Sequence, residues 1–344
     1  MDIHIKYMKR CIELASKGIG KTYPNPMVGC VIVHNDKIIG EGLHQEYGCN
    51  HAEVNAINSV VDKDLLREST LYVNLEPCNH YGKTPPCTEL ILKKEIKNVI
   101  IGSKDPNNVV NGNGIKTLVS NGCNVEFGIL KNECDELNKR FFTFHNRKRP
   151  YIILKWAESK DGFISPKKSD RNKREVFWIS NEESKKLSHY FRSQEHSILV
   201  GVQTVIDDDP ELTTRMVDGN SPIKIILDPN NRIPLNSKVL FNKSETIIFS
   251  STKNLELNID NEVINQFDFD SILESLFKRG IQSMIVEGGA YTIQKFLDAD
   301  IWDCIRIFKS NNNLNTGVIS PKYEVDKLEF RLIGDNKFYE IFKN

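Results

Sequence analysis

The chain has no excess of charge of either sign. Its 344 residues include 46 Lys plus Arg and 46 Asp plus Glu, so its formal net charge is zero. One short basic run occurs, at residues 146–149. Proteins that bind nucleic acid usually carry clustered positive charge, so we expect no nucleic-acid partner.

Features of membrane and secreted proteins are also lacking. No apolar stretch approaches the length of a membrane span, and the first residues lack the apolar core of a signal peptide. The eight cysteines do not show the regular spacing of a disulfide framework. We therefore expect a cytoplasmic protein with no membrane partner.

The length exceeds what one hydrophobic core usually fills, which favours two domains. A polar, basic break at residues 145–150 is followed by an apolar strand at 151–154. We place the first domain at 1–146 and the second at 150–344. Apolar strands alternate with helical stretches through both halves, which predicts the α/β class with sites at the strand ends. Among these elements we expect a strand at 70–75, a helical stretch at 130–143 and a capping box at 180–183 that begins a helix.

The first half contains a pattern of metal ligands. His51 and Glu53 form a His-x-Glu motif, and Cys78 and Cys87 each follow a proline. One imidazole and two thiolates would fill three corners of a zinc tetrahedron and leave the fourth for water, which indicates catalysis. Glu53 is close enough to that corner to serve as a general acid and base. This order of residues is typical of zinc nucleobase deaminases.

The alternative is a closed structural zinc site with Cys49 or His80 as the fourth ligand. The predicted helices favour the catalytic interpretation. Asn50 is suited to cap a helix that begins at the His-x-Glu motif, and Pro86 suits the first turn of another. Both amino ends would then face the metal, where their dipoles favour thiolate.

Five segments of the first half resemble the bifunctional deaminase-reductase family of riboflavin biosynthesis. They are residues 23–29, 42–44, 51–53, 76–87 and 105–107, with eight residues between the two zinc-ligand cysteines. The resemblance implies a cytidine-deaminase-like fold in which His51, Cys78 and Cys87 hold one zinc ion and Glu53 moves the proton. It further implies a pocket for the pyrimidine and the ribose phosphate lined by Asn25, His44, His80, Asp105 and Asn107. Without the resemblance, Asn25, Asp105 and Asn107 would be interpreted as turn residues beside proline.

The second half resembles the reductase part of the same family, which has a dihydrofolate-reductase-like fold and uses NADPH. The glycines after the strand at 283–286 form a strand-to-helix junction suited to a cofactor phosphate, although by itself such a junction is often a tight turn. The cofactor residues implied are Glu158, Trp178, Thr204, Asp208, Gly289, Ala290, Tyr291, Thr292, Ile293, Gln294 and Lys295. The substrate residues implied are Lys155, Val176, Arg192, Leu212, Arg215 and Glu287.

The resemblance implies zinc-dependent deamination of 2,5-diamino-6-(5-phosphoribosylamino)pyrimidin-4-one. NADPH-dependent reduction of the ribosyl group of 5-amino-6-(5-phosphoribosylamino)uracil would follow, in a homo-oligomer. Departures from the family pattern at Lys160, Val176, Pro229 and residues 301–304 leave open a deaminase with a degenerate reductase domain. Two other hypotheses are a nucleoside or RNA deaminase with a binding domain, and a non-enzymatic, zinc-stapled interaction module.

Overall fold

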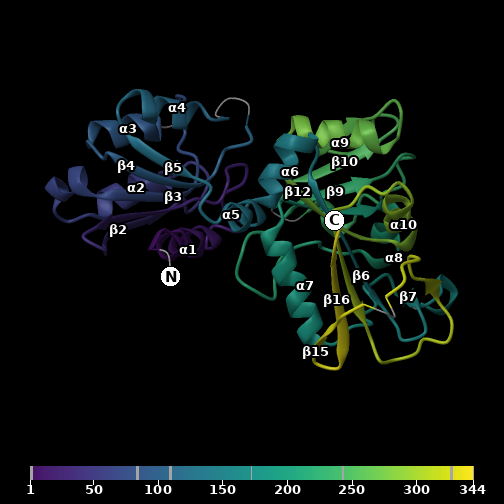
Figure 1. Ribbon diagram of the computed structural model, residues 1–344. Coiled ribbons are helices and arrows are strands. Elements are labelled where there is room, and N and C mark those ends of the chain that lie inside the picture. The colour runs from purple at the N-terminus through teal and green to yellow at the C-terminus, as the bar shows by residue number, and fades with distance from the viewer. Residues whose placement is uncertain are drawn as a thin grey trace. The chain divides into compact units, whose positions relative to one another are not determined.

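The computed structural model describes residues 3–82, 85–107, 111–171, 173–241, 244–325 and 328–343. Its contacts divide the chain into unit 1, Met1–Lys148, and unit 2, Arg149–Asn344, which are described separately (Figure 1). Both units are sheets covered by helices, so the predicted α/β class is confirmed. Lys83 and Thr84, which belong to the segment 76–87, lie outside the described residues.

Unit 1 contains a five-stranded sheet in the order β2-β1-β3-β4-β5. A β-hairpin joins β1 to β2, and β1 also pairs antiparallel with β3, whereas β3, β4 and β5 are parallel. The strands are β1 (Gly29–His34), β2 (Lys37–Leu43), β3 (Thr70–Leu75), β4 (Asn98–Ser103) and β5 (Asn124–Phe127). Parallel strands end at one edge of the sheet, so the segments that follow β3 and β4 are neighbours.

Helices cover both faces of this sheet because its strands are apolar on both sides. The described helices are α1 (Ile3–Ser16), α2 (Ala52–Ser59), η1 (Lys63–Glu68), α3 (Cys87–Lys93), α4 (Asn113–Ser120), α5 (Lys131–Leu137) and α6 (Lys139–Arg147). On β1, Cys30 and Ile32 pack in one core with α2, α3 and α4, whereas Val31 and Val33 pack in the other with α1 and α5. Figure 1 shows α1 on the opposite side of the sheet from α3 and α4.

Two local expectations for unit 1 need correction. Asn50 does not cap α2, because His51 is the N-cap residue and no side chain caps it. The helical stretch expected at 130–143 is two helices, α5 and α6, which meet at Asn138. The Asn138 side chain accepts a hydrogen bond from Met27 N and donates to Met27 O, so tertiary contacts determine this break.

Unit 2 contains a nine-stranded sheet in the order β11-β10-β9-β8-β12-β6-β13-β16-β15. The strands from β11 to β13 in this order are parallel, and β16 and β15 are antiparallel additions. Their bounds are β6 (Tyr151–Glu158), β8 (Ser197–Gly201), β9 (Ile223–Leu227), β10 (Thr246–Ser250), β11 (Asp260–Val263), β12 (Ser283–Gly288), β13 (Cys304–Lys309), β15 (Arg331–Ile333) and β16 (Asn336–Phe342). A separate two-stranded sheet pairs β7 (Phe163–Ser165) with β14 (Val318–Ile319).

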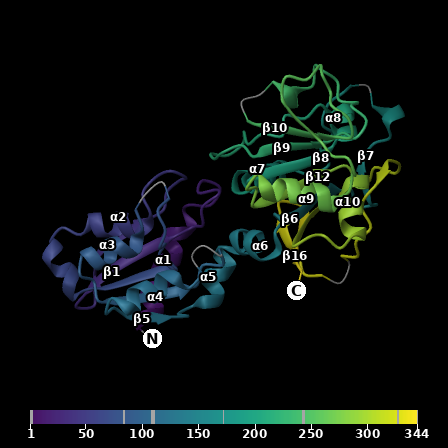
Figure 2. The ribbon, with the colours of Figure 1, turned by 90° about the horizontal axis from the view of Figure 1, so that it is seen from above.

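Helices also cover both faces of the large sheet of unit 2. One core contains α9 (Phe269–Lys278) and α10 (Ala290–Asp298), and the other contains α7 (Glu182–Gln194) and α8 (Val202–Asp208). Figure 2 shows α9 and α10 lying across the sheet. Two single turns, η2 (Lys168–Asp170) and η3 (Lys238–Leu240), complete the described helices. The capping box expected from Ser180 begins one residue later, because Asn181 is the N-cap and accepts from Ser184 N.

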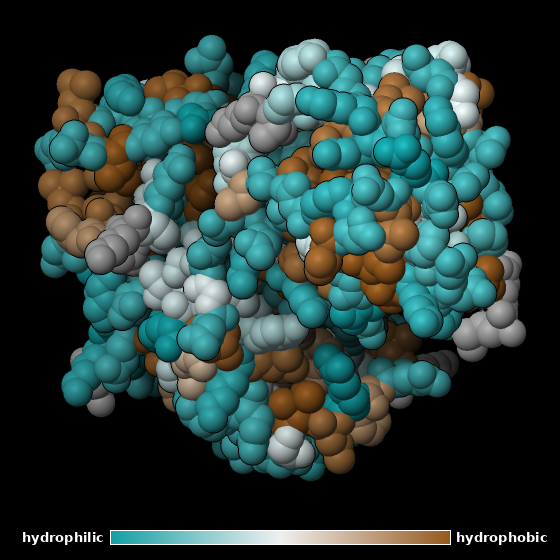
Figure 3. All heavy atoms as spheres, turned by 90° about the vertical axis from the view of Figure 1, so that its left-hand side faces the viewer, coloured by the Kyte–Doolittle hydropathy of each residue, from teal (hydrophilic) through white to brown (hydrophobic). Residues whose placement is uncertain are grey.

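In the part of the chain that the structure describes, no helix is long and apolar enough to cross a membrane. The face drawn in Figure 3 carries hydrophobic residues in patches among hydrophilic ones.

Candidate functional site

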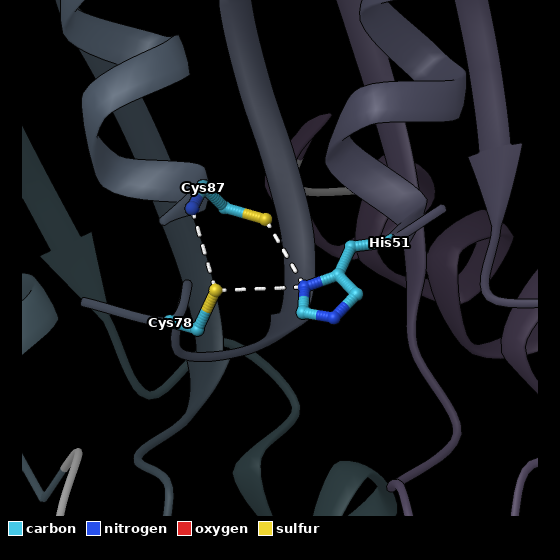
Figure 4. A group of neighbouring side chains, drawn as sticks. All are labelled: His51, Cys78 and Cys87. Atoms are coloured by element: carbon cyan, nitrogen blue, oxygen red, sulfur yellow. Dashed lines mark hydrogen bonds between the residues drawn. The ribbon is translucent and has the colours of Figure 1, made fainter. Parts of the chain in front are cut away.

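Three side chains of unit 1 converge on one point. His51 is the N-cap residue of α2, and Cys87 is the first residue of α3. Cys78 follows the end of β3, and Figure 4 shows both sulfur atoms facing the His51 ring. The amino ends of two helices therefore meet at these ligands, and their dipoles favour negatively charged sulfur.

The distances suit a zinc ion. His51 Nδ1 is 3.5 Å from Cys78 Sγ and 3.3 Å from Cys87 Sγ. Tetrahedral zinc, with bonds of about 2.3 Å to sulfur and about 2.0–2.1 Å to nitrogen, requires S···N separations of about 3.6 Å. Among the described residues, no fourth His, Cys, Asp or Glu joins this group. Cys49, one of the alternative ligands, directs its thiol to Glu46 at 3.7 Å.

The two thiol groups affect each other in opposite directions: the hydrogen bond between them lowers the pKa of Cys78 and raises the pKa of Cys87. Cys87 N donates a hydrogen bond to Cys78 Sγ at 3.3 Å. Hydrogen bonding from Cys87 is the main reason that the pKa of Cys78 falls to about 4, against the opposing effect of burial. The hydrogen bond with Cys78 likewise raises the pKa of His51. A deprotonated sulfur is the form that binds a metal, so the site is prepared for a cation.

Glu53 lies in the first turn of α2 and is only 3% exposed. Burial is the main cause that raises its pKa to about 7, and the negative charge of Cys78 adds to this effect. A carboxyl group with this pKa can both accept and release a proton near neutrality. This is the property that a proton carrier beside the metal ligands requires.

Asn25 and His44 form a polar chain beside the metal ligands. His44 Nδ1 donates to the carbonyl oxygen of Asn50 at 3.0 Å, so its Nε2 accepts from Asn25 Nδ2, also at 3.0 Å. The His44 ring is 5.5 Å from the ring of His51 in an edge-on arrangement. Burial lowers the pKa of His44, which keeps this imidazole neutral.

Asp105 and Asn107 lie in the segment after β4. Asp105 is 8% exposed, and its Oδ1 accepts a hydrogen bond from Asn107 N at 2.7 Å. This is the turn chemistry that the sequence alone suggested for these residues. Burial raises the pKa of Asp105 to about 7. His80 is exposed in the loop after Cys78 and does not belong to the metal-ligand group.

Unit 2 has a cavity of about 220 Å³ at the ends of β6, β8 and β12. Ten of the predicted residues line it, namely Lys155, Val176, Trp178, Arg192, Thr204, Asp208, Leu212, Glu287, Gly289 and Ile293. The remaining predicted residues do not line it, namely Glu158, Arg215, Ala290, Tyr291, Thr292, Gln294 and Lys295. Glu158 is engaged elsewhere, because it accepts from Trp156 Nε1 at 2.9 Å and pairs with Lys309 at 3.4 Å.

A buried ionic cluster lies in the wall of this cavity. Arg192 Nε and Nη2 donate to the two carboxylate oxygens of Glu287, both at 2.8 Å, and Lys155 Nζ is 3.6 Å from the same carboxylate. Burial opposes the charge of Glu287, but Arg192 and then Lys155 lower its pKa to about 2. The parallel donors of Arg192, which would suit a phosphate, are used on Glu287 here. Arg215 remains exposed.

The junction of β12 and α10, which directly follows Glu287, also lines the cavity. Gly289 is the N-cap of α10 and no side chain caps this helix, so the backbone N–H groups of its first turn are available to an anion. Gly288 has φ of 150°, and a Cβ atom on Gly289 would lie 3.4 Å from Thr204 Oγ1. Neither glycine has a side chain that could cover the backbone at this junction. These features fit the phosphates of a dinucleotide.

Sequence reasoning missed three polar residues that shape the sites. Asn74 on β3 accepts from Gly29 N and donates to Met27 O, and Asn138 bonds to Met27 as well. Glu76, the first residue of the segment 76–87, accepts hydrogen bonds from three backbone N–H groups. For Asn74 and Glu76 the sequence does carry a signal, a polar residue inside an apolar strand or directly after it, whereas Asn138 lies between two helices and has no such signal.

Comparison with known families gives two matches. Residues 1–103 match the cytidine and deoxycytidylate deaminase zinc-binding region, and residues 150–310 match the RibD C-terminal domain. The riboflavin biosynthesis protein RibD of Aquifex aeolicus is 38% identical over 325 residues, which cover 92% of this chain and 89% of that protein. The RibD protein of Escherichia coli is 32% identical over 322 residues, which cover 88% of this chain and 86% of that protein.

Two solved structures are similar over almost the whole chain. One is the diaminohydroxyphosphoribosylaminopyrimidine deaminase/5-amino-6-(5-phosphoribosylamino)uracil reductase of Thermotoga maritima, at 35% identity and a TM-score of 0.87. The other is RibD of Acinetobacter baumannii, at 30% identity and a TM-score of 0.88. Each comparison covers 99% of this chain and 98% of the other.

Proposed function

The chain belongs to the RibD family of bifunctional deaminase-reductases of riboflavin biosynthesis, and we propose the following division of labour between its two units. Unit 1 deaminates 2,5-diamino-6-(5-phosphoribosylamino)pyrimidin-4-one. Unit 2 reduces the ribosyl group of 5-amino-6-(5-phosphoribosylamino)uracil to ribityl. The observation that carries the proposal is the convergence of His51, Cys78 and Cys87 beside the buried carboxyl group of Glu53.

The residues of unit 1 divide the work of hydrolysis. His51, Cys78 and Cys87 would hold one zinc ion, which when bound supplies the Lewis acidity that makes water a nucleophile near neutral pH. Glu53 would take one proton as the water oxygen bonds to the ring carbon. It would then deliver that proton to the amino nitrogen as the C–N bond breaks and ammonia leaves. The pKa of about 7 supports both transfers.

We assign the substrate pocket of unit 1 to polar residues around the metal ligands. Asn25 and His44 would contact the pyrimidine, since they form a chain that ends beside His51. Asp105, Asn107 and His80 would contact the ribose phosphate. The segment after β4 and the segment after β3 leave the same edge of the sheet, which supports this assignment.

The residues of unit 2 would bind NADPH and the deaminated product in the cavity. NADPH would supply the hydride for reduction. The uncapped start of α10, within residues 289–295, would hold its phosphates, with Trp178, Thr204 and Asp208 completing the cofactor site. Lys155 and Arg192 keep Glu287 ionised, so this carboxylate can accept hydrogen bonds from ribose hydroxyl groups. Leu212, Arg215 and Val176 would complete the substrate site.

Two of the competing hypotheses are disfavoured by particular observations. A closed, non-catalytic zinc site needs a fourth ligand, and the described residues offer none beside the three. A degenerate reductase domain would not be expected to keep a buried cluster of Lys155, Arg192 and Glu287 at a cavity, because charged groups in that position cost stability. We also propose a cytoplasmic homo-oligomer, since none of the eight cysteines forms a disulfide and no net charge opposes self-association.

The proposal is tested by supplying the diaminopyrimidine phosphate to the purified protein. Without NADPH, the product should differ in mass by the exchange of an amino group for oxygen. With NADPH, it should gain two further hydrogens. An unchanged substrate in both reactions, with one zinc ion bound per chain, would refute the assignment.

A further inference from the structure

Glu76 is a buried carboxylate between β3 and the zinc-ligand candidate Cys78. Its residue is only 4% exposed. Its Oε2 accepts hydrogen bonds from Asp105 N at 3.2 Å and from Gly112 N at 2.9 Å, and its Oε1 accepts from Ile115 N at 3.1 Å. A buried carboxylate is costly unless such donors compensate it, so this one is fully committed to the backbone of another segment.

The partners of Glu76 begin α4 and the segment that leads to it. Gly112 is the N-cap of α4, with φ of 83°, and no side chain of its own caps the helix. Two of the helix's initial N–H groups, those of Gly112 and Ile115, are satisfied by Glu76 instead. The negative charge also suits the positive end of the helix dipole.

The packing between the two segments is tight. A Cβ atom on Gly114 would lie 2.2 Å from the carbonyl oxygen of Pro77 and 3.2 Å from Glu76 Oε1. No side chain fits there, so the first turn of α4 rests directly on the residues before Cys78. Glu76 N also donates to Ser103 O at the end of β4, at 2.9 Å. The segment is therefore held to β4 and to α4 together.

We propose that Glu76 is a positioning residue for the deaminase site. It holds the backbone of Asp105, and through it the turn to Asn107, at a fixed place relative to Cys78. This inference rests on the proposed function, in which Asp105 and Asn107 contact the ribose phosphate while Cys78 holds zinc. One carboxylate then sets the distance between the part of the site that binds the substrate and the part that carries out the reaction.

A purely structural role for Glu76 would have different consequences. Loss of a structural hydrogen-bond acceptor lowers the stability of unit 1 and leaves the KM for substrate unchanged in the folded enzyme. Loss of a positioning residue raises KM, because the contacts with the substrate are displaced. It leaves kcat almost unchanged, because Glu53 and the zinc ligands remain in place.

The test uses the full chain with Glu76→Gln, which keeps the size of the side chain but removes its charge and one acceptor. Zinc should stay at one ion per chain. The KM of deamination should rise by roughly tenfold or more, as expected for loss of a hydrogen bond to a charged group. Amide hydrogen exchange at Gly112 and Ile115 should become faster. Reduction of the deaminated product by the same protein should be unchanged, which shows that unit 2 is intact, and the retained zinc shows that the metal site of unit 1 is still assembled.

Asp62→Asn is the matched control. Asp62 also accepts a hydrogen bond from a backbone N–H group at a helix start, that of Asp64, but at the surface of the same unit. This variant should keep the wild-type KM. Glu76→Ala should raise KM at least as much as Glu76→Gln.

Three results would overturn the inference while wild-type deamination is intact. They are an unchanged KM in both Glu76 variants, unchanged amide exchange in α4, or loss of zinc together with activity. The last result would place the effect on the metal ligands. A wild-type protein that does not deaminate the substrate would refute the proposed function itself, and the positioning role with it.

Discussion

The sites of the two units are built in different ways. In unit 1, three ligands from short motifs meet at the starts of α2 and α3, and the reactive carboxyl group is two residues from the first ligand. In unit 2, a cavity is lined by residues from many elements, and its charged cluster joins β6, α7 and β12. The first arrangement can be read as a local pattern, whereas the second exists only in the folded sheet.

The two kinds of site should also respond differently when one residue is removed. A metal site loses its ion when one of three ligands is lost, so its function disappears at once. A cavity loses one contact of many, and its function should decline by degrees. The predictions below test this contrast, beginning with the largest expected effect.

Replacement of Cys78 or Cys87 by Ala should abolish zinc binding and deamination. Two ligands alone hold zinc too weakly, and unit 2 has its own cores, so reduction of supplied deaminated product should persist. Metal analysis and ammonia release measure the first effect, and NADPH consumption measures the second. Full zinc content in both variants would mean that the ligand set is wrong.

Glu53→Gln should lower the deamination rate by roughly a hundredfold or more while zinc stays bound. The amide keeps the size of the side chain but cannot carry the proton. Steady-state rates and metal content of the same preparation provide the measurement. A variant that deaminates at the wild-type rate would identify Glu53 as a carboxyl group without a role in the reaction.

Arg192→Ala should weaken reduction and destabilise unit 2. Truncation leaves Glu287 with Lys155 alone and removes two hydrogen bonds to Glu287 and one to Thr213 O. Breaking a buried ion pair typically costs about 3–5 kcal/mol. Urea unfolding and the KM for the deaminated product would detect these effects. Deamination should be unaffected, and a parallel loss of both activities would contradict the separation of the sites.

The ionic cluster should make the stability of unit 2 depend on pH. The folded-state pKa of Glu287, about 2, is below its ordinary value of 4.5, so its contribution is present above about pH 4.5 and is lost as pH falls toward 2. The contribution is on the order of 3 kcal/mol. The difference in unfolding free energy between wild type and Glu287→Gln should therefore shrink between pH 6 and pH 2. A constant difference would show that the charge of Glu287 does not stabilise the fold.

The smallest effect is expected from Val176→Ser. Val176 lines the cavity, and it is one of the departures from the family pattern, for which the resemblance implies serine at this position. Restoring the hydroxyl group adds at most one hydrogen bond, worth about 0.5–1.5 kcal/mol, so affinity for substrate or cofactor should improve by up to roughly tenfold. Titration of each ligand would measure this. A loss of affinity would show that the valine makes a favourable apolar contact instead.

Local sequence patterns predicted the zinc ligands and the strands of unit 1, but not the long-range hydrogen bonds that hold these elements together. The zinc ligands could be recognised because each lies beside a proline or a helix start, and β3 was predicted at residues 70–75, the bounds it has. The contacts of Glu76 could not be recognised from the sequence, because its three hydrogen-bond partners lie 29 to 39 positions away. The break at Asn138 has the same origin, since its partner Met27 is 111 positions away.

In unit 2, the sequence indicated residue types but not their pairing. The arginine at position 192 suits a phosphate by its chemistry, yet the fold directs both of its parallel donors to Glu287. Glu158 follows the apolar start of β6, and only the fold shows that Trp156 and Lys309 occupy it. Pairings of this kind depend on which strands are neighbours in the sheet. Arg192 and Glu287 are 95 positions apart, so the local sequence does not indicate that they pair.

The most direct test of two independent sites in one chain uses the Cys78→Ala variant with the deaminated product and NADPH. This variant should lack zinc and should not release ammonia from the diaminopyrimidine. It should nevertheless oxidise one NADPH for each ribityl product formed, at the wild-type rate. No NADPH oxidation at saturating concentrations, in the variant and in the wild type alike, would contradict the account and leave a deaminase whose second unit does not catalyse reduction.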